Sequence, residues 1–319
     1  MLILKKLMNN PMCAKKLFIV GIGRSGTTLL QSMLNAHPDI CFTPETHFIK
    51  RFIVPQLSSR KELNKKDLQG LLQKDKYFSR LNIPIEENLK KYRSVISNQD
   101  LIELFDCVLN QYAKSKNKSF VGDKDPMNSS YISQIQYCFP KSFLIHIIRD
   151  PRDVILSRMR SDWGKDTSFA VHLAEHNVQL ENMLSNGMAL FREKYVEVYY
   201  EQLLENPAKE LQKICNKIGL LYNREMLDFQ KKAEELVFSE EKAWKGNVSK
   251  PILKNNKNKW KSGLTNYQVS LVELVLKKHF ILLGYPMENK VLFSAFLMKF
   301  YVGLIALLFR VKLKKQLVR

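Results

Sequence analysis

The chain has 319 residues, of which 45% are hydrophobic, and 51 Lys and Arg against 31 Asp and Glu give it a formal net charge of +20. This share of apolar side chains excludes a disordered chain, because it can supply a sizeable core. The length alone does not distinguish two average domains from one α/β domain with an appendage.

The positive charge is concentrated near the C-terminus. Residues 245–319 contain 15 Lys and Arg against two acids, Glu273 and Glu288, so they carry +13 of the +20. A solvated basic tail would explain this, and so would binding to nucleic acid, to an anionic membrane surface or to an anionic small ligand. Aromatic and basic residues there form separate blocks rather than alternating, which argues against nucleic acid.

The first predicted strand is the apolar run Leu17–Val20, which the glycine-rich segment Gly21–Thr28 (GIGRSGTT) and a helix-like pattern follow. A second run, Phe143–Ile148, leads into another helical pattern, and a third, 195–200, precedes a further one. Buried strands that alternate with helices indicate an α/β fold with a P-loop-type parallel sheet flanked by helices. The polar, helix-periodic region 60–115 is predicted to be an inserted helical region.

The segment Gly21–Thr28 has the spacing of a phosphate-binding P-loop, except that Thr27 stands where nucleotide kinases have lysine. Its glycines allow backbone N–H groups to converge on an anion, and Ser25, Thr27 and Thr28 add hydroxyl donors. The segment is therefore expected to bind phosphate. A kinase-like phosphotransferase remains an alternative, although no strand ends in an aspartate placed to hold Mg²⁺.

The last predicted element is an apolar C-terminal helix over 291–309, where 16 of 19 residues are apolar. Ser294, Lys299 and Gly303 interrupt it, and the basic segment RVKLKKQLVR follows. A helix in the membrane interface and a core helix both fit this pattern. A membrane span is less favoured, because Lys299 near its centre would cost roughly 3 kcal/mol.

The ends and cysteines of the chain favour a cytoplasmic protein. The five cysteines are scattered without a C-x-x-C pair, so buried reduced thiols are expected rather than a disulfide framework or a zinc knuckle. Lys5, Lys6 and Pro11 leave no apolar stretch long enough for a signal peptide. The segment His172–His176 (HLAEH) fits a zinc-peptidase pattern, but such a short pattern often arises by chance, and no metal is expected.

Two motifs carry a resemblance to a known family. GIGRSGTTLL followed by IIRDPRDVILS resembles the cofactor motifs of sulfotransferases that use 3′-phosphoadenosine 5′-phosphosulfate (PAPS). In that family the first motif holds the 5′-phosphosulfate, and the second supplies an Arg and, eight residues later, a Ser for the 3′-phosphate. The resemblance implies a cofactor-binding set of Arg24, Ser25, Gly26, Thr27, Thr28, Arg149 and Ser157.

One branch of the family matches further. RSGTTLLQSMLNAHPDICFTPET is similar to protein-tyrosine sulfotransferases and their bacterial relatives, which implies that Glu45 is the general base. The resemblance of VGDKDP implies that Lys124 contacts the transferring group. VYYEQL and SKPILKNNKNKW imply that Tyr200 packs beside the cofactor and that a loop with Lys259 closes over the nucleotide.

Two positions depart from that branch. Gly122 stands where a cysteine is expected in secreted members, and Ser161 stands where the branch has an arginine, for which Arg160 is a loose substitute. These departures put specificity for a protein acceptor in doubt. A cytoplasmic enzyme at a membrane surface would meet glycolipid and lipid-linked saccharide hydroxyls, so an acceptor hydroxyl of a carbohydrate or glycolipid is favoured, with protein tyrosine as the alternative.

The motifs together predict a mechanism and a division of the chain. Glu45 removes the acceptor proton, while Arg24 and Lys124 stabilise the sulfuryl group and the bridging oxygen. Residues 15–287 are predicted to form the PAPS-dependent sulfotransferase domain, with PAP as the released product. Residues 288–319 form a C-terminal segment whose expected partner is an anionic membrane surface, on the inner face of the membrane.

Overall fold

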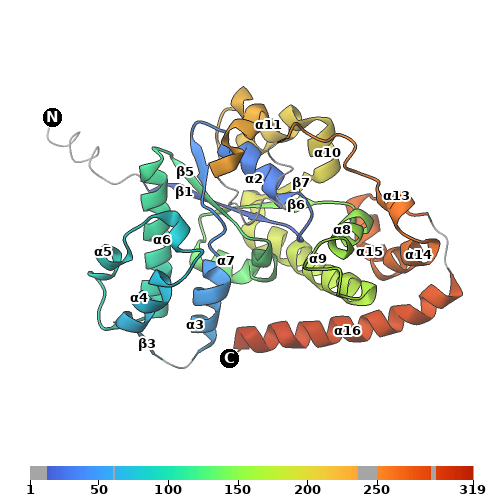
Figure 1. The fold of residues 1–319 in the computed structure, drawn as a ribbon, viewed down its shortest axis with the longest axis horizontal. Coiled ribbons are helices and arrows are strands. Elements are labelled where there is room, and N and C mark those ends of the chain that lie inside the picture. The colour runs from blue at the N-terminus through green and yellow to red at the C-terminus, as the bar shows by residue number, and fades with distance from the viewer. Residues whose placement is uncertain (1–12, 60–61, 236–249, 289–291, 319) are drawn as a thin grey trace.

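The computed structural model describes residues 13–59, 62–235, 250–288 and 292–318. Its centre is a five-stranded parallel sheet in the order β2-β5-β1-β6-β7 (Figure 1). The strands are β1 (Lys15–Val20), β2 (Ile40–Phe42), β5 (Phe120–Lys124), β6 (Phe143–Ile148) and β7 (Tyr195–Tyr199). The predicted parallel α/β fold is confirmed. The three predicted strands are present, whereas the sequence patterns did not indicate β2 and β5.

Alternate residues of the central strand serve the two faces of the sheet. In β1, Leu17 and Ile19 pack into one core cluster, and Phe18 and Val20 pack into the other. Helices cover both faces (Figure 1). The first cluster includes residues of α2 (Thr27–Asn35), α10 (Tyr200–Glu205), α11 (Pro207–Ile218) and η5 (Arg224–Glu235), and the second includes residues of α6 (Asn98–Ser115), α7 (Ile132–Cys138) and α9 (Phe169–Phe191).

The predicted inserted helical region is present beside the sheet. The segments between β2 and α6 are η1 (Ile49–Ile53), α3 (Val54–Ser58), α4 (Lys65–Gln73), η2 (Ser79–Leu81) and α5 (Ile85–Leu89). A two-stranded antiparallel ladder, β3 (Leu63–Asn64) with β4 (Val95–Ile96), closes the region and was not predicted. Helix α6 then begins at a capping box, in which Ser97 and Asp100 bond reciprocally.

The remaining elements follow the sheet strands toward the C-terminus. They are η3 (Pro126–Ser130), α8 (Pro151–Met159), η4 (Arg192–Lys194), α13 (Trp260–Gly263), α14 (Asn266–Val275), α15 (Lys277–Leu283) and α16 (Phe293–Val318). Arg152, which is only 1% exposed, ties this end together: it bonds both oxygens of Asp150, pairs with Glu273 of α14 and lies over the Trp260 ring. The RDPRD segment therefore holds the C-terminal helices against the sheet.

The apolar C-terminal helix lies along the outside of the molecule (Figure 1). It packs against α9, α14 and α3. Phe293–Leu313 is long and apolar enough to cross a membrane, yet only 17% of its most apolar window is buried. The structure therefore does not enclose it as a core helix.

The five cysteines are all unpaired thiols. Cys41, Cys138 and Cys215 are buried, as expected from the sequence, whereas Cys107 is half-buried and Cys13 is exposed. Burial raises the pKa of Cys41 and of Cys138 to about 12 and that of Cys215 to about 11. These three thiols therefore stay protonated at neutral pH.

Candidate active site

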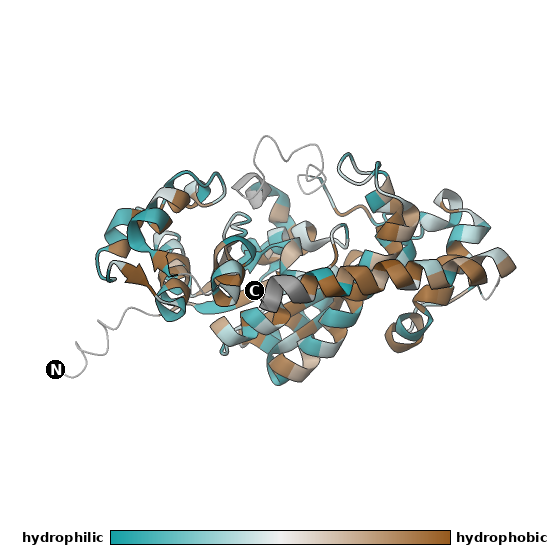
Figure 2. Ribbon diagram, turned by 90° about the horizontal axis from the view of Figure 1, so that it is seen from below, coloured by the Kyte–Doolittle hydropathy of each residue, from teal (hydrophilic) through white to brown (hydrophobic). Residues whose placement is uncertain are grey.

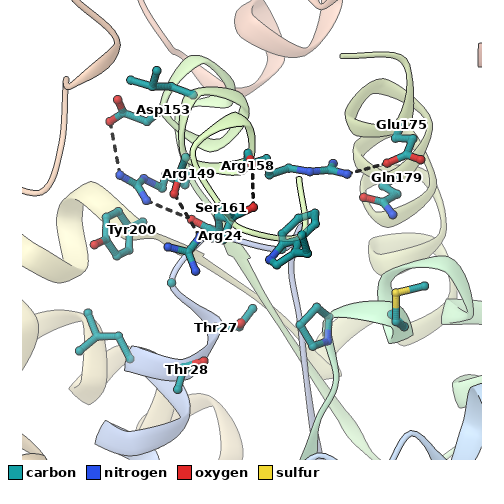
Figure 3. Close-up of a pocket in the computed structure, with 18 of the residues that line it drawn as sticks. Arg24, Thr27, Thr28, Arg149, Asp153, Arg158, Ser161, Glu175, Gln179 and Tyr200 are labelled. Carbon is teal, nitrogen blue, oxygen red and sulfur yellow. Dashed lines mark hydrogen bonds and ion pairs between the residues drawn. The ribbon is translucent and has the colours of Figure 1, made fainter. Parts of the chain in front are cut away.

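A cavity of about 750 Å³ opens where the segments that follow β1, β5 and β6 meet (Figure 3). In parallel α/β sheets, ligands bind outside the carboxyl ends of the strands, which is where this cavity lies. Of the predicted site residues, nine line the cavity: Arg24, Gly26, Thr27, Thr28, Glu45, Arg149, Ser157, Tyr200 and Lys259. Ser25 and Lys124 do not form its wall, because both are buried behind it.

The loop after β1 has backbone geometry that needs glycine at one position. Gly26 has φ +96°, and a Cβ there would stand 2.4 Å from Cδ2 of Tyr200. Arg24 also has a positive φ, +83°. Helix α2 begins directly after Gly26 and has no side-chain cap, so its first N–H groups and positive end are available to an anion.

Arg149 follows β6 and is held from two sides. Its Nη1 donates to the carbonyl of Arg24 at 3.0 Å, and its Nη2 donates to the carbonyl of Asn256 at 3.0 Å. Its guanidinium lies 4.5 Å from the ring centroid of Tyr200. The buried Nε of Arg149 has no hydrogen-bond partner within the described part of the chain. This donor needs an acceptor from a ligand or from water.

A second arginine adds positive charge at the same end of the cavity. The Nε of Arg24 donates to Oγ of Ser157 at 3.1 Å. Burial, together with the charge of Arg149, lowers the pKa of Arg24. Asp153 lies 3.7 Å from Arg149, and its own pKa is raised by burial. Two arginines at one end of the cavity, with a carboxylate beside Arg149 alone, form a site suited to a multiply charged anion.

Lys124 and Glu45 meet at the other end of the loop. Lys124, the last residue of β5, is fully buried, and its Nζ pairs with Oε1 of Glu45. The same Nζ lies 3.4 Å from Oγ1 of Thr28, at the start of α2. Lys124, expected to contact the transferring group, is therefore in contact both with Glu45, the expected base, and with the loop.

Gly122 lies two residues before Lys124 in the same strand. A Cβ at this position would stand 2.1 Å from a ring carbon of Phe42, in the neighbouring strand β2. The Phe42 ring therefore occupies the space that a cysteine side chain would need. This packing gives a physical reason for the departure from the pattern of the secreted branch.

His47 lies beside Glu45 and was not singled out from the sequence. Its Nδ1 is 2.6 Å from Oδ2 of Asp125, and its Nε2 is 3.9 Å from Glu45. Burial opposes a charge on His47, but the hydrogen bond to Asp125 and the nearby carboxylates outweigh it and raise the pKa of His47. The closely spaced acids and histidine of TPETH and DKDP were the available sequence signal.

Asp123 is buried beside this group and does not line the cavity. It accepts hydrogen bonds from Thr46 at 3.0 Å and from Asn128 at 3.0 Å. Burial and the charge of Asp125 raise the pKa of Asp123 to about 6. Ionisation of this carboxyl at neutral pH therefore carries a desolvation cost in the folded protein.

The outer part of the cavity is more aromatic and also polar. Arg158 of α8 pairs with Glu175 of α9, and its buried Nε and Nη1 have no hydrogen-bond partner in the portion of the chain described. Trp163 is 54% exposed beside them, and Gln179 and Phe309 complete this wall. The sequence motifs did not indicate these residues, because three separate helices bring them together.

Ser161 and Arg160, the positions of the second departure, both line the cavity. Ser161 Oγ donates to the carbonyl of Arg158 at 2.7 Å. Arg160 is exposed, whereas Arg158 is only 6% exposed. Arg158 rather than Arg160 is thus the buried cation of this wall.

The loop that contains Lys259 is connected to the cavity through Asn256. The side-chain amide of Asn256 donates to the Tyr200 hydroxyl at 2.8 Å, and the N–H of Trp260 donates to Asp153 at 2.9 Å. Lys259 itself is exposed at the cavity wall.

The two histidines of HLAEH are buried in α9, where His172 Nε2 lies 2.9 Å from the carbonyl of Gly164.

Comparison with known proteins gives consistent matches to one family. The model of the "Sulfotransferase family" matches residues 16–224. A "Putative protein-tyrosine sulfotransferase" of Caenorhabditis briggsae is 28% identical over 218 residues, which cover 66% of this chain and 68% of that protein. The "Protein-tyrosine sulfotransferase" of Drosophila melanogaster is 26% identical over 251 residues, which cover 76% of this chain but only 46% of that protein.

Solved structures show the same fold. The sulfotransferase domain of the Synechococcus PCC 7002 olefin synthase superposes with a TM-score of 0.60 at 20% identity, covering 84% of this chain and 95% of that domain. The sulfotransferase domain from the curacin biosynthetic pathway superposes with a TM-score of 0.61 at 18% identity, covering 86% of this chain and 99% of that domain.

Proposed function

The chain belongs to the sulfotransferase family, and from this premise we propose that it transfers a sulfuryl group from PAPS to an acceptor hydroxyl and releases PAP. One observation carries the proposal: a single cavity has two arginines at one end of the P-loop and, at the other, Glu45 paired with the buried Lys124. A nucleotide with a 3′-phosphate and a 5′-phosphosulfate is a ligand with two such anionic ends.

The residues at the arginine end fit a phosphate. Arg149 has a buried donor that no described residue satisfies, and Ser157 presents a hydroxyl beside Arg24. Gly26, Thr27 and Thr28 offer backbone and hydroxyl donors at the N-terminus of α2. We assign Arg149 and Ser157 to the 3′-phosphate and the loop to the 5′-phosphate, with Ser25 supporting the loop from behind and Tyr200 and Lys259 flanking the nucleotide.

PAPS supplies the activated sulfuryl group. Glu45 accepts the proton as the acceptor oxygen forms its bond to sulfur, while the sulfur–oxygen bond to the leaving phosphate breaks. Lys124 and Arg24 place positive charge where negative charge develops on the sulfuryl and bridging oxygens. The His47 imidazole, held by Asp125, faces the same carboxylate and positions it.

A hydroxyl of a carbohydrate or glycolipid is the acceptor that we favour. The outer wall offers an exposed indole at Trp163, a carboxylate at Glu175 and an amide at Gln179. Aromatic faces pack against sugar rings, and carboxylates and amides hydrogen-bond to hydroxyls. Protein tyrosine is the second candidate, because proteins similar to this chain are named protein-tyrosine sulfotransferases.

A kinase-like phosphotransferase is less well supported. Thr27 occupies the position of the lysine that nucleotide kinases use, and the chain belongs to the sulfotransferase family. We expect neither a metal ion nor nucleic acid to take part. We place the enzyme in the cytoplasm, on the inner face of the membrane.

The test is incubation of the full chain with ³⁵S-labelled PAPS and a membrane extract, with separation of lipid, polysaccharide and protein afterwards. We expect label in lipid or polysaccharide, and incorporation roughly 10²–10⁴-fold slower with Glu45→Gln. Label in tyrosine alone would favour the second candidate. Transfer from γ-labelled ATP but not from PAPS would contradict the proposed donor.

A further inference from the structure

Helix α16 is apolar on two opposite faces. On the face toward the protein, Ala295, Val302 and Ala306 are at most 2% exposed, and Ile305 and Phe309 are partly buried beside them. The other side lies across the outside of the molecule (Figure 2). Its large apolar side chains are 37–78% exposed: Phe293, Phe296, Leu297, Met298, Phe300, Tyr301, Leu304, Leu307, Leu308 and Val311.

Such a helix is not suited to water on its outer side. A surface helix normally presents polar residues to solvent, and one that is apolar all round lies among apolar groups. Ten large exposed side chains along one continuous helix exceed the scattered apolar residues that ordinary surfaces carry. The outer face therefore requires an apolar partner.

The charges around this face identify the kind of partner. Residues 289–319 contain seven Lys and Arg and no Asp or Glu. At 100° per residue, Lys299 and Lys312 lie on opposite edges of the apolar face, and both are exposed. Basic residues that flank an apolar face match the phosphates and acyl chains of an anionic lipid surface. A second copy of the same helix would instead bring seven more positive charges.

The helix is attached to the wall of the candidate active site. Phe309 lines the cavity from α16, and Glu175 and Gln179 line it from α9. The next turn of α9 provides Glu181, which pairs with Arg310 of α16. A lipid surface against α16 would thus lie beside the outer part of the cavity.

We infer that the outward face of α16 binds an anionic lipid bilayer and that the acceptor is a membrane lipid whose polar head carries a hydroxyl and enters the cavity past Phe309. The acceptor half of this inference rests on the proposed function. The bilayer half does not depend on it.

The first test is co-sedimentation of the full chain with vesicles of phosphatidylcholine alone and of phosphatidylcholine mixed with phosphatidylglycerol. We expect the mixed vesicles to bind the protein at least about tenfold more strongly, as several basic residues near an anionic surface should provide. The double variant Leu304→Glu/Leu308→Glu should bind them at least about tenfold more weakly. The control is Leu221→Glu, which changes an 87% exposed leucine outside α16 and should leave vesicle binding unchanged.

PAP affinity and thermal unfolding are measured in parallel, and both should be unchanged in the double variant, because Leu304 and Leu308 are exposed and lie outside the cavity wall. Undiminished binding of the double variant, or no binding to mixed vesicles, would overturn the bilayer half. So would a change from dimer to monomer in the double variant without any effect on vesicles.

The second test uses vesicles of a total membrane lipid extract with ³⁵S-labelled PAPS. We expect label in the lipid phase, reduced at least about tenfold by Leu304→Glu/Leu308→Glu. Label confined to soluble or protein acceptors would overturn the acceptor half while leaving the sulfotransferase function intact. Vesicle binding without transfer of label to any acceptor would contradict the proposed function and leave the bilayer half standing.

Discussion

The ring of Tyr200 lies so close to Gly26 that a Cβ on Gly26 would stand 2.4 Å from it. Tyr200 begins α10 after β7, and Gly26 ends the loop after β1, so this contact joins two segments of the cavity that are far apart in the chain. The same ring lies under the Arg149 guanidinium. The shape of the loop and the position of the arginine are therefore set together.

Gly26→Ala should disrupt nucleotide binding. Alanine at φ +96° is strained by roughly 1–3 kcal/mol, and its methyl group would also collide with Tyr200. We expect PAP binding, measured by calorimetry, to weaken at least about tenfold. Gly219→Ala is the matched control, because Gly219 has φ +80° but no atom near its Cβ position. Equal loss of PAP affinity in both variants would contradict the role given to the Tyr200 contact.

Glu45→Gln should separate catalysis from binding. The amide keeps the size of the carboxylate but cannot accept the acceptor proton, so we expect kcat to fall roughly 10²–10⁴-fold. PAP affinity should stay near that of the unaltered enzyme, because Glu45 is assigned to the acceptor. Full turnover by this variant would show that another group is the base.

Lys124→Met should reduce sulfuryl transfer, whereas the same change at another buried lysine should reduce stability alone. It removes the cation beside Glu45 and Thr28, and we expect kcat to fall roughly 10²-fold or more. Lys16→Met is the control. Lys16 is also a buried lysine of the sheet, in β1 beside β5, and it also pairs with a carboxylate, that of Asp106. Both variants should unfold at lower temperature, but only Lys124→Met should lose activity.

Ser157→Ala should weaken binding of nucleotides that carry a 3′-phosphate. A hydrogen bond to a charged group contributes about 1.5–3 kcal/mol, so PAP should bind roughly 10- to 100-fold more weakly. The affinity for 5′-AMP, which lacks the 3′-phosphate, should not change. Ser161→Ala serves as the comparison, because Ser161 also lines the cavity but bonds to the Arg158 carbonyl. An equal loss for PAP and 5′-AMP would refute the assignment of Ser157.

The buried carboxyl of Asp123 should make stability depend on pH. Its pKa is about 6 in the folded protein against an ordinary 3.8, so folding favours the protonated form. The stability that this group contributes is present below about pH 4 and is lost as pH rises through about 6, by up to roughly 3 kcal/mol. Asp123→Asn should remove this loss, since Asn128 can turn its Oδ1, which bonds to none of the described residues, toward the new amide. Urea unfolding of both proteins at about pH 4.5 and about pH 7 measures the difference. The same change in unfolding free energy between the two pH values in Asp123→Asn as in the unaltered protein would contradict this prediction.

Continuous apolar runs predicted β1 and β6 well. A strand buried on both faces is apolar over most of its length, so these two were recognisable. β6 has the predicted bounds, and β1 begins two residues before the predicted strand. β2 has only three residues, and β5 ends in Gly122, Asp123 and Lys124, so neither has that pattern. The polar end of β5 is tolerated because Thr46, Asn128 and Glu45 pair with its side chains.

The motif residues of the site were identifiable because the loop and the strand ends impose short fixed spacings. Three other residues were not identifiable. Asn256 reaches the cavity through its contact with Arg149, 107 residues earlier, Arg158 pairs with Glu175 of another helix, and His47 lies in a turn with positive φ. The outward face of α16 could not be derived from composition either. Ser294 and Lys299, which interrupt its apolar run, lie on different edges of the helix.

Both amino groups of Arg149 are bound by backbone carbonyls, those of residues 24 and 256. A carbonyl oxygen is present whatever side chain its residue carries. Substitutions at Arg24 or Asn256 can therefore alter what the cavity recognises without releasing Arg149 from its place. As sequences diverge, the position of the Arg149 guanidinium can stay constant while the neighbouring side chains vary.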